Sequence, residues 1–317
     1  MINPLNRYRS YNSYLREIFG ERVQKISLDA GFTCPNRDGT ISRGACIYCD
    51  SRGSGSGAMI QGGESLDEQM VKGMDWARKK YGASRFIAYF QSFTNTYGPV
   101  PHLRELYDRA LKHEGVVGLS VSTRPDCVDK EVLGLLASYK KNFLVWLELG
   151  LQSAHDSTLV KINRGHDVAC FDRAVAEAHA DGLNVCAHVI LGLPGETHEM
   201  MMETARHLGA LAAEGVKIHA LYVVEDTPLA EIYEKGGYRC LKREEYVDLL
   251  LDFLERLPPG MVIQRLTGDP MPAELVAPLW VKEKTKTLNL IQKRFEERDS
   301  WQGKSFHIDH CSLDIAH

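Results

Sequence analysis

The sequence lacks any run of about eighteen apolar residues, and its first residues show neither the apolar stretch nor the small-residue cleavage site of a signal peptide. We therefore expect a cytoplasmic protein with no membrane partner. The basic excess typical of many nucleic-acid-binding proteins is also missing, because the formal net charge is -4. Basic residues gather near the C-terminus, where a solvated helix face and a local basic face are both open interpretations. They are Lys282, Lys284, Lys286, Lys293 and Arg294.

The sequence offers little support for a disulfide-stapled fold. Its eight cysteines are spread over 317 residues, and no secretory signal accompanies them. We therefore expect reduced thiols that either bind metal or lie buried. With 44% hydrophobic residues the chain can bury a sizeable core, and its length predicts one main domain with an appendage.

Short apolar runs alternate with longer amphipathic stretches between residues 23 and 257. This alternation predicts an α/β fold with stacked βαβ units and a parallel sheet. The predicted strands are residues 23–28, 86–91, 116–122, 143–150, 184–191 and 217–223. The predicted helices are residues 65–81, 100–113, 129–139, 168–181, 198–214 and 243–257. The pattern fits an open doubly wound sheet and a barrel equally well.

The rhythm changes after Pro258 and Pro259. A possible strand over residues 261–266, a Gly/Pro loop and a helix over residues 281–297 follow. We therefore expect a core barrel with an N-terminal lead-in over residues 1–257, and a short C-terminal α/β extension and tail over residues 258–317.

Three cysteines stand close together in the segment CPNRDGTISRGACIYC, directly after the first predicted strand. Cys46 and Cys49 are separated by two residues, and Cys34 precedes them. Parallel α/β folds build their sites at the carboxyl ends of the strands. Three thiolates can hold three irons of a [4Fe–4S] cube and leave the fourth iron open. The amino and carboxylate groups of S-adenosylmethionine (SAM) can chelate such an open iron.

Zinc is the competing interpretation of these cysteines. A structural zinc site needs four ligands, and no Cys or Cys/His pair at short spacing follows Cys49. The spacing therefore favours a cluster. A zinc-stabilised binding module stays open as a hypothesis from a different functional class.

Polar residues occur at the carboxyl end of every predicted strand, as a site at a barrel mouth requires. They could contact SAM, although each one alone could also make an ordinary structural hydrogen bond. Glu148 could pair with a buried cation or accept a ribose hydroxyl, and Arg164 could bind the SAM carboxylate through two hydrogen bonds. Single histidines on apolar strands, such as His188 and His219, are usually core residues. The candidates for SAM binding are Gln91, Thr94, Asn95, Arg124, Glu148, Gln152, Arg164 and Gly192.

With these motifs the chain resembles the YhcC/YtqA-type radical SAM proteins, relatives of the radical SAM domain of the Elongator catalytic subunit. The resemblance rests on the cysteine segment and on FQSFTNTYG, STRPDC, LELGLQSAHDSTLVKINRGH, HVILGLPGE and VKIHALYV. It implies a partial (β/α)6 barrel, a [4Fe–4S] cluster on Cys34, Cys46 and Cys49, and reductive cleavage of SAM to a 5′-deoxyadenosyl radical. By the same resemblance, SAM contacts would come from the segments around Gln91, Arg124, Glu148, Gln152, Arg164 and Gly192.

The kinship with Elongator leads us to expect a substrate in tRNA, at the side chain on position 5 of the wobble uridine. A carboxymethyl-type group there could be removed or remodelled. An electron donor such as flavodoxin or ferredoxin would be a partner. A small metabolite or a peptide is the alternative substrate, and the acidic net charge suits it.

Overall fold

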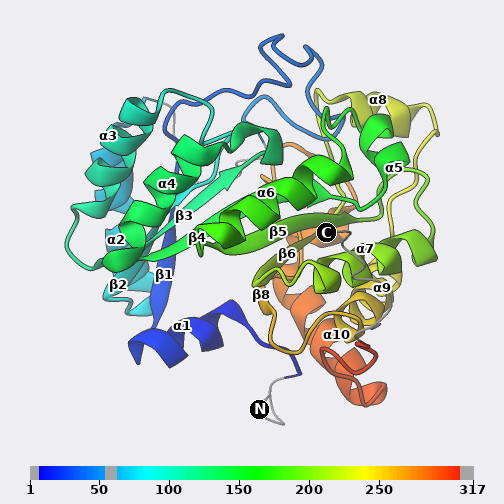
Figure 1. Cartoon of the computed structure of the whole chain (residues 1–317). Coiled ribbons are helices and arrows are strands. Elements are labelled where there is room, and N and C mark those ends of the chain that lie inside the picture. Colours follow the sequence, from blue (N-terminus) through cyan, green and yellow to red (C-terminus); the bar gives the residue numbers. More distant parts are fainter. Residues whose placement is uncertain (1–6, 54–62, 308–317) are drawn as a thin grey trace, which may run out of the picture.

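A parallel sheet of seven strands forms the centre of the molecule (Figure 1). The structure, a computed structural model, describes residues 7–53 and 63–307; the rest of the chain, including Cys311, lies outside the described residues. The strand order is β1-β2-β3-β4-β5-β6-β8, so the chain adds neighbouring strands in sequence. The strands are β1 (Val23–Leu28), β2 (Arg85–Phe90), β3 (Val116–Thr123), β4 (Leu144–Gln152), β5 (Asn184–Leu191), β6 (Gly215–Ala220) and β8 (Val262–Arg265).

A helix connects each of these strands to the next, and the helices cover the outer face of the curled sheet (Figure 1). Polar caps fix where several of them begin: Ser65 and Glu68 form a capping box, and the side chains of Asp129, Asp167 and Thr197 accept backbone N–H groups. The connecting helices are α2 (Leu66–Tyr81), α3 (Val100–Leu111), α4 (Lys130–Ser138), α5 (Asp156–Lys161), α6 (Val168–Ala180), α7 (His198–Ala210), α8 (Pro228–Glu234) and α9 (Arg243–Glu255).

The predicted α/β barrel is confirmed, with one strand more than the six expected. The sheet curls into a half-barrel whose six first strands match the predicted ones within a few residues. The seventh, β8, lies within the segment 261–266 that was expected as a strand of the C-terminal extension, and it pairs in parallel with β6. Sequence periodicity shows that a segment is extended but does not show which strand it joins.

A helix that the sequence did not predict, α1 (Tyr11–Phe19), lies across the lower end of the half-barrel (Figure 1). It begins at Ser10, whose hydroxyl accepts the N–H of Ser13, and ends at Gly20 with φ of 73°. Ser10 also forms a parallel bridge with Ile263, and α1 contacts both β1 and β8. The helix therefore spans the space between the two edge strands of the sheet.

The region after β6 adds a small antiparallel pair, β7 (Val223–Val224) with β9 (Leu275–Ala277), and a last helix, α10 (Lys284–Glu297), packed on α9. The basic residues of α10 lie opposite acidic partners. Lys284 pairs with Asp269 at 3.3 Å, and Arg294 pairs with Glu297 at 2.8 Å. This helix therefore presents an ion-paired face rather than an unopposed basic one.

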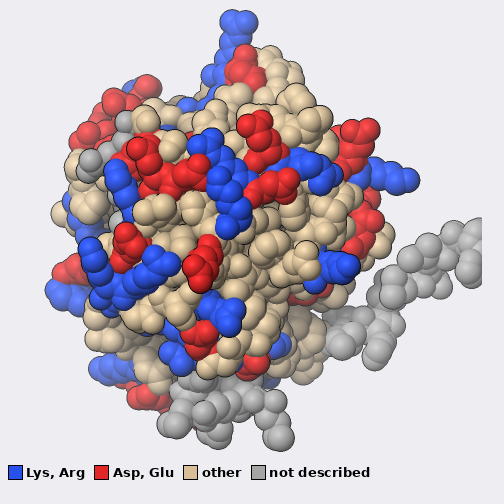
Figure 2. Space-filling model, turned by 90° about the vertical axis from the view of Figure 1, so that its left-hand side faces the viewer, with Lys and Arg blue, Asp and Glu red and all other residues tan. Residues whose placement is uncertain are grey.

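Figure 2 shows a face of the molecule on which basic and acidic side chains are intermixed. Pairs such as Arg78 with Asp75 and Arg109 with Asp67 belong to the helices α2 and α3. Within the described ranges, none of the helices has the length and apolar character needed to cross a bilayer.

Candidate active site

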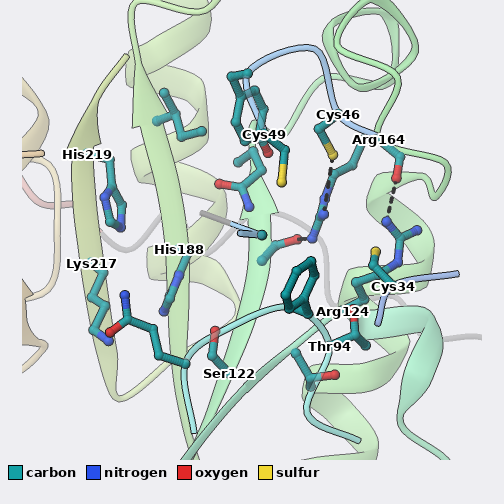
Figure 3. A pocket seen from close by; sticks show the side chains of 18 of the residues that line it. Cys34, Cys46, Cys49, Thr94, Ser122, Arg124, Arg164, His188, Lys217 and His219 are labelled. Carbon is teal, nitrogen blue, oxygen red and sulfur yellow. Dashed lines mark hydrogen bonds between the residues drawn. The ribbon is translucent and has the colours of Figure 1, made fainter. Parts of the chain in front are cut away.

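A pocket opens at the carboxyl ends of the strands, inside the curl of the sheet (Figure 3). The cysteine loop after β1 contributes Cys34, Cys46 and Cys49 to its wall. Strands across the width of the sheet contribute polar side chains, from Tyr89 on β2 to Arg265 on β8. The three cysteines of the sequence motif therefore share one cavity with residues that are more than two hundred positions away.

The three thiols approach this cavity from different sides. In Figure 3 the sulfur atoms of Cys46 and Cys49 point down from the loop, and that of Cys34 points up towards them. Within the described chain, no three His, Cys, Asp or Glu side chains stand close enough to share one metal ion. Each thiolate of a [4Fe–4S] cluster binds a different iron, so thiols spaced around a cavity suit a cluster.

Nitrogen donors are directed at two of these sulfurs. Arg37 Nη2 donates to Cys49 Sγ at 3.2 Å, and both Asn36 Nδ2 and Arg164 Nη1 donate to Cys46 Sγ at 3.7 Å. Such N–H donors tune a cluster bound to the sulfurs. The loop therefore places donors beside two of the sulfurs that a cluster would use.

Side chains after α5 hold the cysteine loop in place. Asn163 donates to the carbonyl of Ala45, and its own carbonyl accepts Asn36 Nδ2 at 2.7 Å. The backbone N–H of Ile47 donates to the carbonyl of Ile162 at 3.1 Å. These hydrogen bonds explain why residues 162–164, which are far from the cysteines in the sequence, lie beside them.

The two arginines predicted to contact SAM are already engaged. Arg124 forms a two-bond ion pair with Asp126 at 2.7 and 2.8 Å, and its Nη1 donates to the carbonyl of Arg164. Arg164 in turn donates to Gly150 O at 2.8 Å and to Cys46. Its Nε–H is buried without a partner in the described part of the chain, so one donor stays available for a ligand.

The structure brings most of the predicted SAM-binding residues to the pocket but not all of them. Asn95 is fully buried and donates to the carbonyl of Ser122. Gly192 donates its N–H to Met201 Sδ and accepts from Tyr238. Glu148 is fully buried beneath the pocket wall. The predicted residues that line the pocket are Gln91, Thr94, Arg124, Gln152 and Arg164.

Glu148 organises a buried polar network that includes two lysines, so it makes the cation pairing that was one of the two roles considered for it. One carboxylate oxygen accepts Lys25 and Ser120, and the other accepts Lys217 and the Nε2–H of His188 at 2.8 Å. Four donors therefore converge on one carboxylate, which is the arrangement that makes a buried charge tolerable.

The network shifts the pKa values of its members. Burial alone raises the pKa of Glu148, but Lys217, Lys25 and His188 outweigh it and leave that pKa well below its usual range. Burial lowers the pKa of Lys217 to about 7 despite Glu148, and it lowers the pKa of His188 to about 4. Burial, together with Arg265, takes the pKa of His219 well below its usual range. Both imidazoles are therefore uncharged at neutral pH.

Sequence reasoning missed the polar layer inside the sheet. His188 and His219 fit the pattern of core residues, and Lys217 and Arg265 stood alone in apolar strands, yet all four line the pocket. Three of them share a register: His188 lies opposite Lys217, and Lys217 lies opposite Arg265, on three successive strands. His219 lies two positions after Lys217 on β6 and therefore on the same face. Polar residues at matching positions of neighbouring strands share a face, so this signal becomes visible once the strand order is known.

The sequence profile of the Radical SAM superfamily matches residues 34–208, and that of the Radical_SAM C-terminal domain matches residues 213–297. The protein YtqA of Bacillus subtilis is 42% identical over 96% of this chain and 94% of its own length. The protein YhcC of Escherichia coli is 39% identical over 84% of this chain and 85% of its own. Elongator complex protein 3 of Homo sapiens is 29% identical over 49% of this chain and 29% of its own length.

Among solved structures, Elp3 of the archaeon Methanocaldococcus infernus has a TM-score of 0.67. It is 18% identical, and the alignment covers 88% of this chain and 64% of that one, so the likeness is one of fold. The superfamily profile begins at Cys34 and includes the whole cysteine loop. A cluster fits the residues present there, since three thiols surround one cavity and donors meet two of them. The chain therefore belongs to the radical SAM superfamily, a class of enzymes whose cofactors are a [4Fe–4S] cluster and SAM.

Proposed function

We propose that Cys34, Cys46 and Cys49 hold three irons of the cluster and leave the fourth iron to bind SAM. The observation that carries this proposal is the convergence of the three thiols on one pocket at the carboxyl ends of the strands. When bound, the cluster and SAM supply one-electron cleavage of SAM to a 5′-deoxyadenosyl radical, which abstracts hydrogen from a substrate. A flavodoxin or ferredoxin would supply the electron.

The chain's own residues bind and orient the reactants. Gln91, Thr94 and Gln152 line the pocket with uncharged polar groups suited to the amino and hydroxyl groups of SAM. Arg164 supports Cys46 and keeps its buried Nε–H for a ligand. The ion pair with Asp126 fixes Arg124, which therefore positions Arg164 through its carbonyl rather than reaching for SAM itself. We assign Asn95, Glu148 and Gly192 structural roles, because they do not line the pocket but lie behind the residues that do.

We further propose that the substrate is tRNA and that the reaction remodels a carboxymethyl-type group on position 5 of the wobble uridine. The kinship with the radical SAM region of Elongator complex protein 3 supports this proposal. The ion-paired α10 adds no support, because its lysines and arginines have acidic neighbours. A cytoplasmic location is part of the same proposal, since a reducing compartment keeps free thiols and clusters intact.

Cluster binding is tested by anaerobic reconstitution with iron and sulfide, reduction with dithionite in the presence of SAM, and chromatography for 5′-deoxyadenosine. Cys46→Ala should lose both the brown colour and the cleavage product. Cys170→Ala is the matched control, because Cys170 lies in the first turn of α6 and does not line this pocket. A Cys46→Ala protein that keeps its iron and its cleavage activity would refute the assignment.

The tRNA substrate is tested by comparing the modified nucleosides of tRNA from cells with and without the gene. We expect one wobble-uridine derivative to accumulate and its product to vanish. An unchanged nucleoside profile, together with no salt-sensitive tRNA binding by the purified protein, would end the proposal.

A small metabolite or peptide is the second candidate substrate, favoured by the acidic net charge and by the intermixed charges in Figure 2. It predicts substrate-dependent 5′-deoxyadenosine formation in cell extracts from which RNA has been removed. Formation that depends on added RNA would exclude it.

A further inference from the structure

The pocket has a second end that the cluster and SAM do not explain. Lys217 and His219 on β6 and Arg265 on β8 line it, together with His188 and Tyr89. In Figure 3, Lys217, His188 and His219 lie on the side of the pocket away from Cys34 and Cys46. Lys217 and Arg265 are register partners on adjacent strands, so their side chains stand next to each other on the inner face of the sheet.

This end of the pocket carries more positive than negative charge. Lys25 and Lys217 share the single carboxylate of Glu148. Their other hydrogen-bond partners are uncharged: Gln264 Oε1 at 2.7 Å from Lys25 and Tyr89 Oη at 2.8 Å from Lys217. One ammonium charge therefore has no carboxylate of its own among the described residues.

Arg265 adds a second positive charge at the pocket wall. Its ion pair with Asp269 is long, at 3.8 Å, and the Asp269 side chain is 52% exposed. The Lys217 side chain, in contrast, is 6% exposed. A buried cation without a counter-charge is costly, and a bound anion removes that cost. The pocket thus has a reason to recruit an anion from outside the chain.

We propose that Lys217 and Arg265, with His219 beside them, form a subsite for a carboxylate group of the substrate. The subsite deepens the proposed function and rests on it for the identity of the substrate. Arg265 can donate two hydrogen bonds to one carboxylate, and Lys217 supplies a point charge. The uncharged His219 donates or accepts one further hydrogen bond.

Charge balance favours a carboxylate carried by the substrate over the other available anions. SAM has a carboxylate, but the open iron at the cysteine end of the pocket binds it in the proposed arrangement. Glu148 offsets one of the two lysines and Asp269 offsets Arg265, so one positive charge is left over at this end of the pocket, and a phosphate dianion would overcompensate it. A monoanionic group at the end of a short substituent, such as a carboxymethyl group on a nucleobase, matches both the charge and the burial.

The test uses the reconstituted holoenzyme with SAM and three anticodon stem-loop RNAs that differ at the wobble position. One carries 5-carboxymethyluridine, one its uncharged methyl ester and one uridine, and isothermal titration calorimetry measures their affinities. We expect the carboxylate to bind roughly 10- to 100-fold more tightly than the ester, the effect of one charged hydrogen-bonded contact. Lys217→Met should abolish this preference, and Lys217→Arg should restore part of it.

Lys235→Met is the charge-matched control, because Lys235, directly after α8, has a side chain that is 77% exposed and pairs with Glu231. It should retain the preference for the carboxylate. Lys217→Met should still fold, since Glu148 keeps Lys25 and His188 as partners. Iron content per chain and thermal unfolding check this point before affinities are compared.

Equal affinity of the wild type for all three RNAs would overturn the subsite and leave the tRNA proposal standing. Failure of the wild type to bind any of the RNAs would overturn the tRNA proposal instead. In that case the subsite is tested by thermal unfolding of the holoenzyme in sodium acetate, sodium chloride and sodium phosphate at equal ionic strength. Stabilisation by acetate in the wild type but not in Lys217→Met supports it. Equal or greater stabilisation by phosphate, or none by acetate, overturns it.

Discussion

Replacing Glu148 by Gln should destabilise the protein strongly, because it leaves two buried ammonium groups without a counter-charge. The Glu148 side chain is 0% exposed, and those of Lys25 and Lys217 are 15% and 6% exposed. Removing one partner of such a buried ion pair typically costs about 3–5 kcal/mol. That is a large part of the roughly 5–15 kcal/mol by which folded domains are stable.

The loss should also depend on pH. In the wild type the pKa of Lys217 is about 7, and without Glu148 it falls further. Above pH 7 Lys217 is neutral in both folded proteins and adds nothing to the difference between them. Below pH 7 Lys217 is protonated in the folded wild type as it is in the unfolded chain, so the stability of the wild type levels off. In the folded variant Lys217 stays neutral to a lower pH, so the variant keeps losing stability, and the defect of Glu148→Gln grows as the pH falls from 8 to 6.

Urea denaturation under anaerobic conditions at pH 6 and pH 8 measures the free energy of unfolding. The exposed Glu199, paired with Arg206, supplies a control in Glu199→Gln, which should match the wild type. Adding Lys217→Met to Glu148→Gln should recover part of the loss, because one unpaired ammonium is then gone. A variant within about 1 kcal/mol of the wild type at both pH values would refute the reasoning.

Three further outcomes follow from the pocket. Carboxylate binding needs a protonated Lys217, whose pKa is about 7. The Kd for the RNA with 5-carboxymethyluridine, measured by calorimetry, should therefore rise about tenfold per pH unit above 7. A Kd that stays constant up to pH 9 would contradict this prediction. Arg37→Met removes a donor that lies 3.2 Å from the sulfur of Cys49. Loss of this hydrogen bond, worth about 1–2 kcal/mol, should lower the reduction potential of the cluster by roughly 40–90 mV, measured in a redox titration followed by electron paramagnetic resonance. An unchanged midpoint potential would show that Arg37 does not act on that sulfur. A Cβ at residue 150 would lie 2.4 Å from Arg164 Nη2 and displace that arginine, so Gly150→Ala should lower the iron content per chain after reconstitution. Gly134→Ala is the control, because a Cβ there meets nothing within 4 Å. Equal iron content in the two variants would argue against the role of Arg164.

The main strands and the cysteine loop could be predicted from the sequence because their signals are local. Runs rich in β-branched and aromatic residues identify the strands, and residues 86–91 differ from β2 (Arg85–Phe90) by one position at each end. The spacing of Cys34, Cys46 and Cys49 likewise lies within one short segment. Both patterns can be recognised without knowing which strands are neighbours in the sheet.

The charged layer beneath the pocket could not be predicted, since it exists through strand pairing. Lys217 is one basic residue in an apolar strand, and its meaning depends on Glu148, Lys25 and Arg265 from three other strands. The arginines illustrate the same limit. Arg164 and Arg124 line the pocket as expected of SAM-binding residues, but their bonds to the cysteine loop and to Asp126 could not be read from the sequence.

Helix α1 was missed for a related reason. Its buried face is short, with Leu15 the fully buried residue, and its aromatic side chains resemble a strand or loop as much as a helix. Tyr11 and Tyr14 gain their role from Trp146 on β4, against which both pack edge-on. That contact joins segments 132 to 135 residues apart, which no local pattern reveals.

The lower end of the barrel has a consequence for how the protein matures. Lys25 on β1 reaches Gln264, and the two residues are 239 positions apart. Gln264 is also 215 positions beyond Cys49 (264 minus 49). At a synthesis rate of about 5–20 residues per second, the ribosome completes this side of the barrel roughly 10–40 s after it has made the three cysteines. The thiols therefore exist for that interval without the finished chamber around them, and reducing partners or the machinery of cluster delivery have this window in which to act.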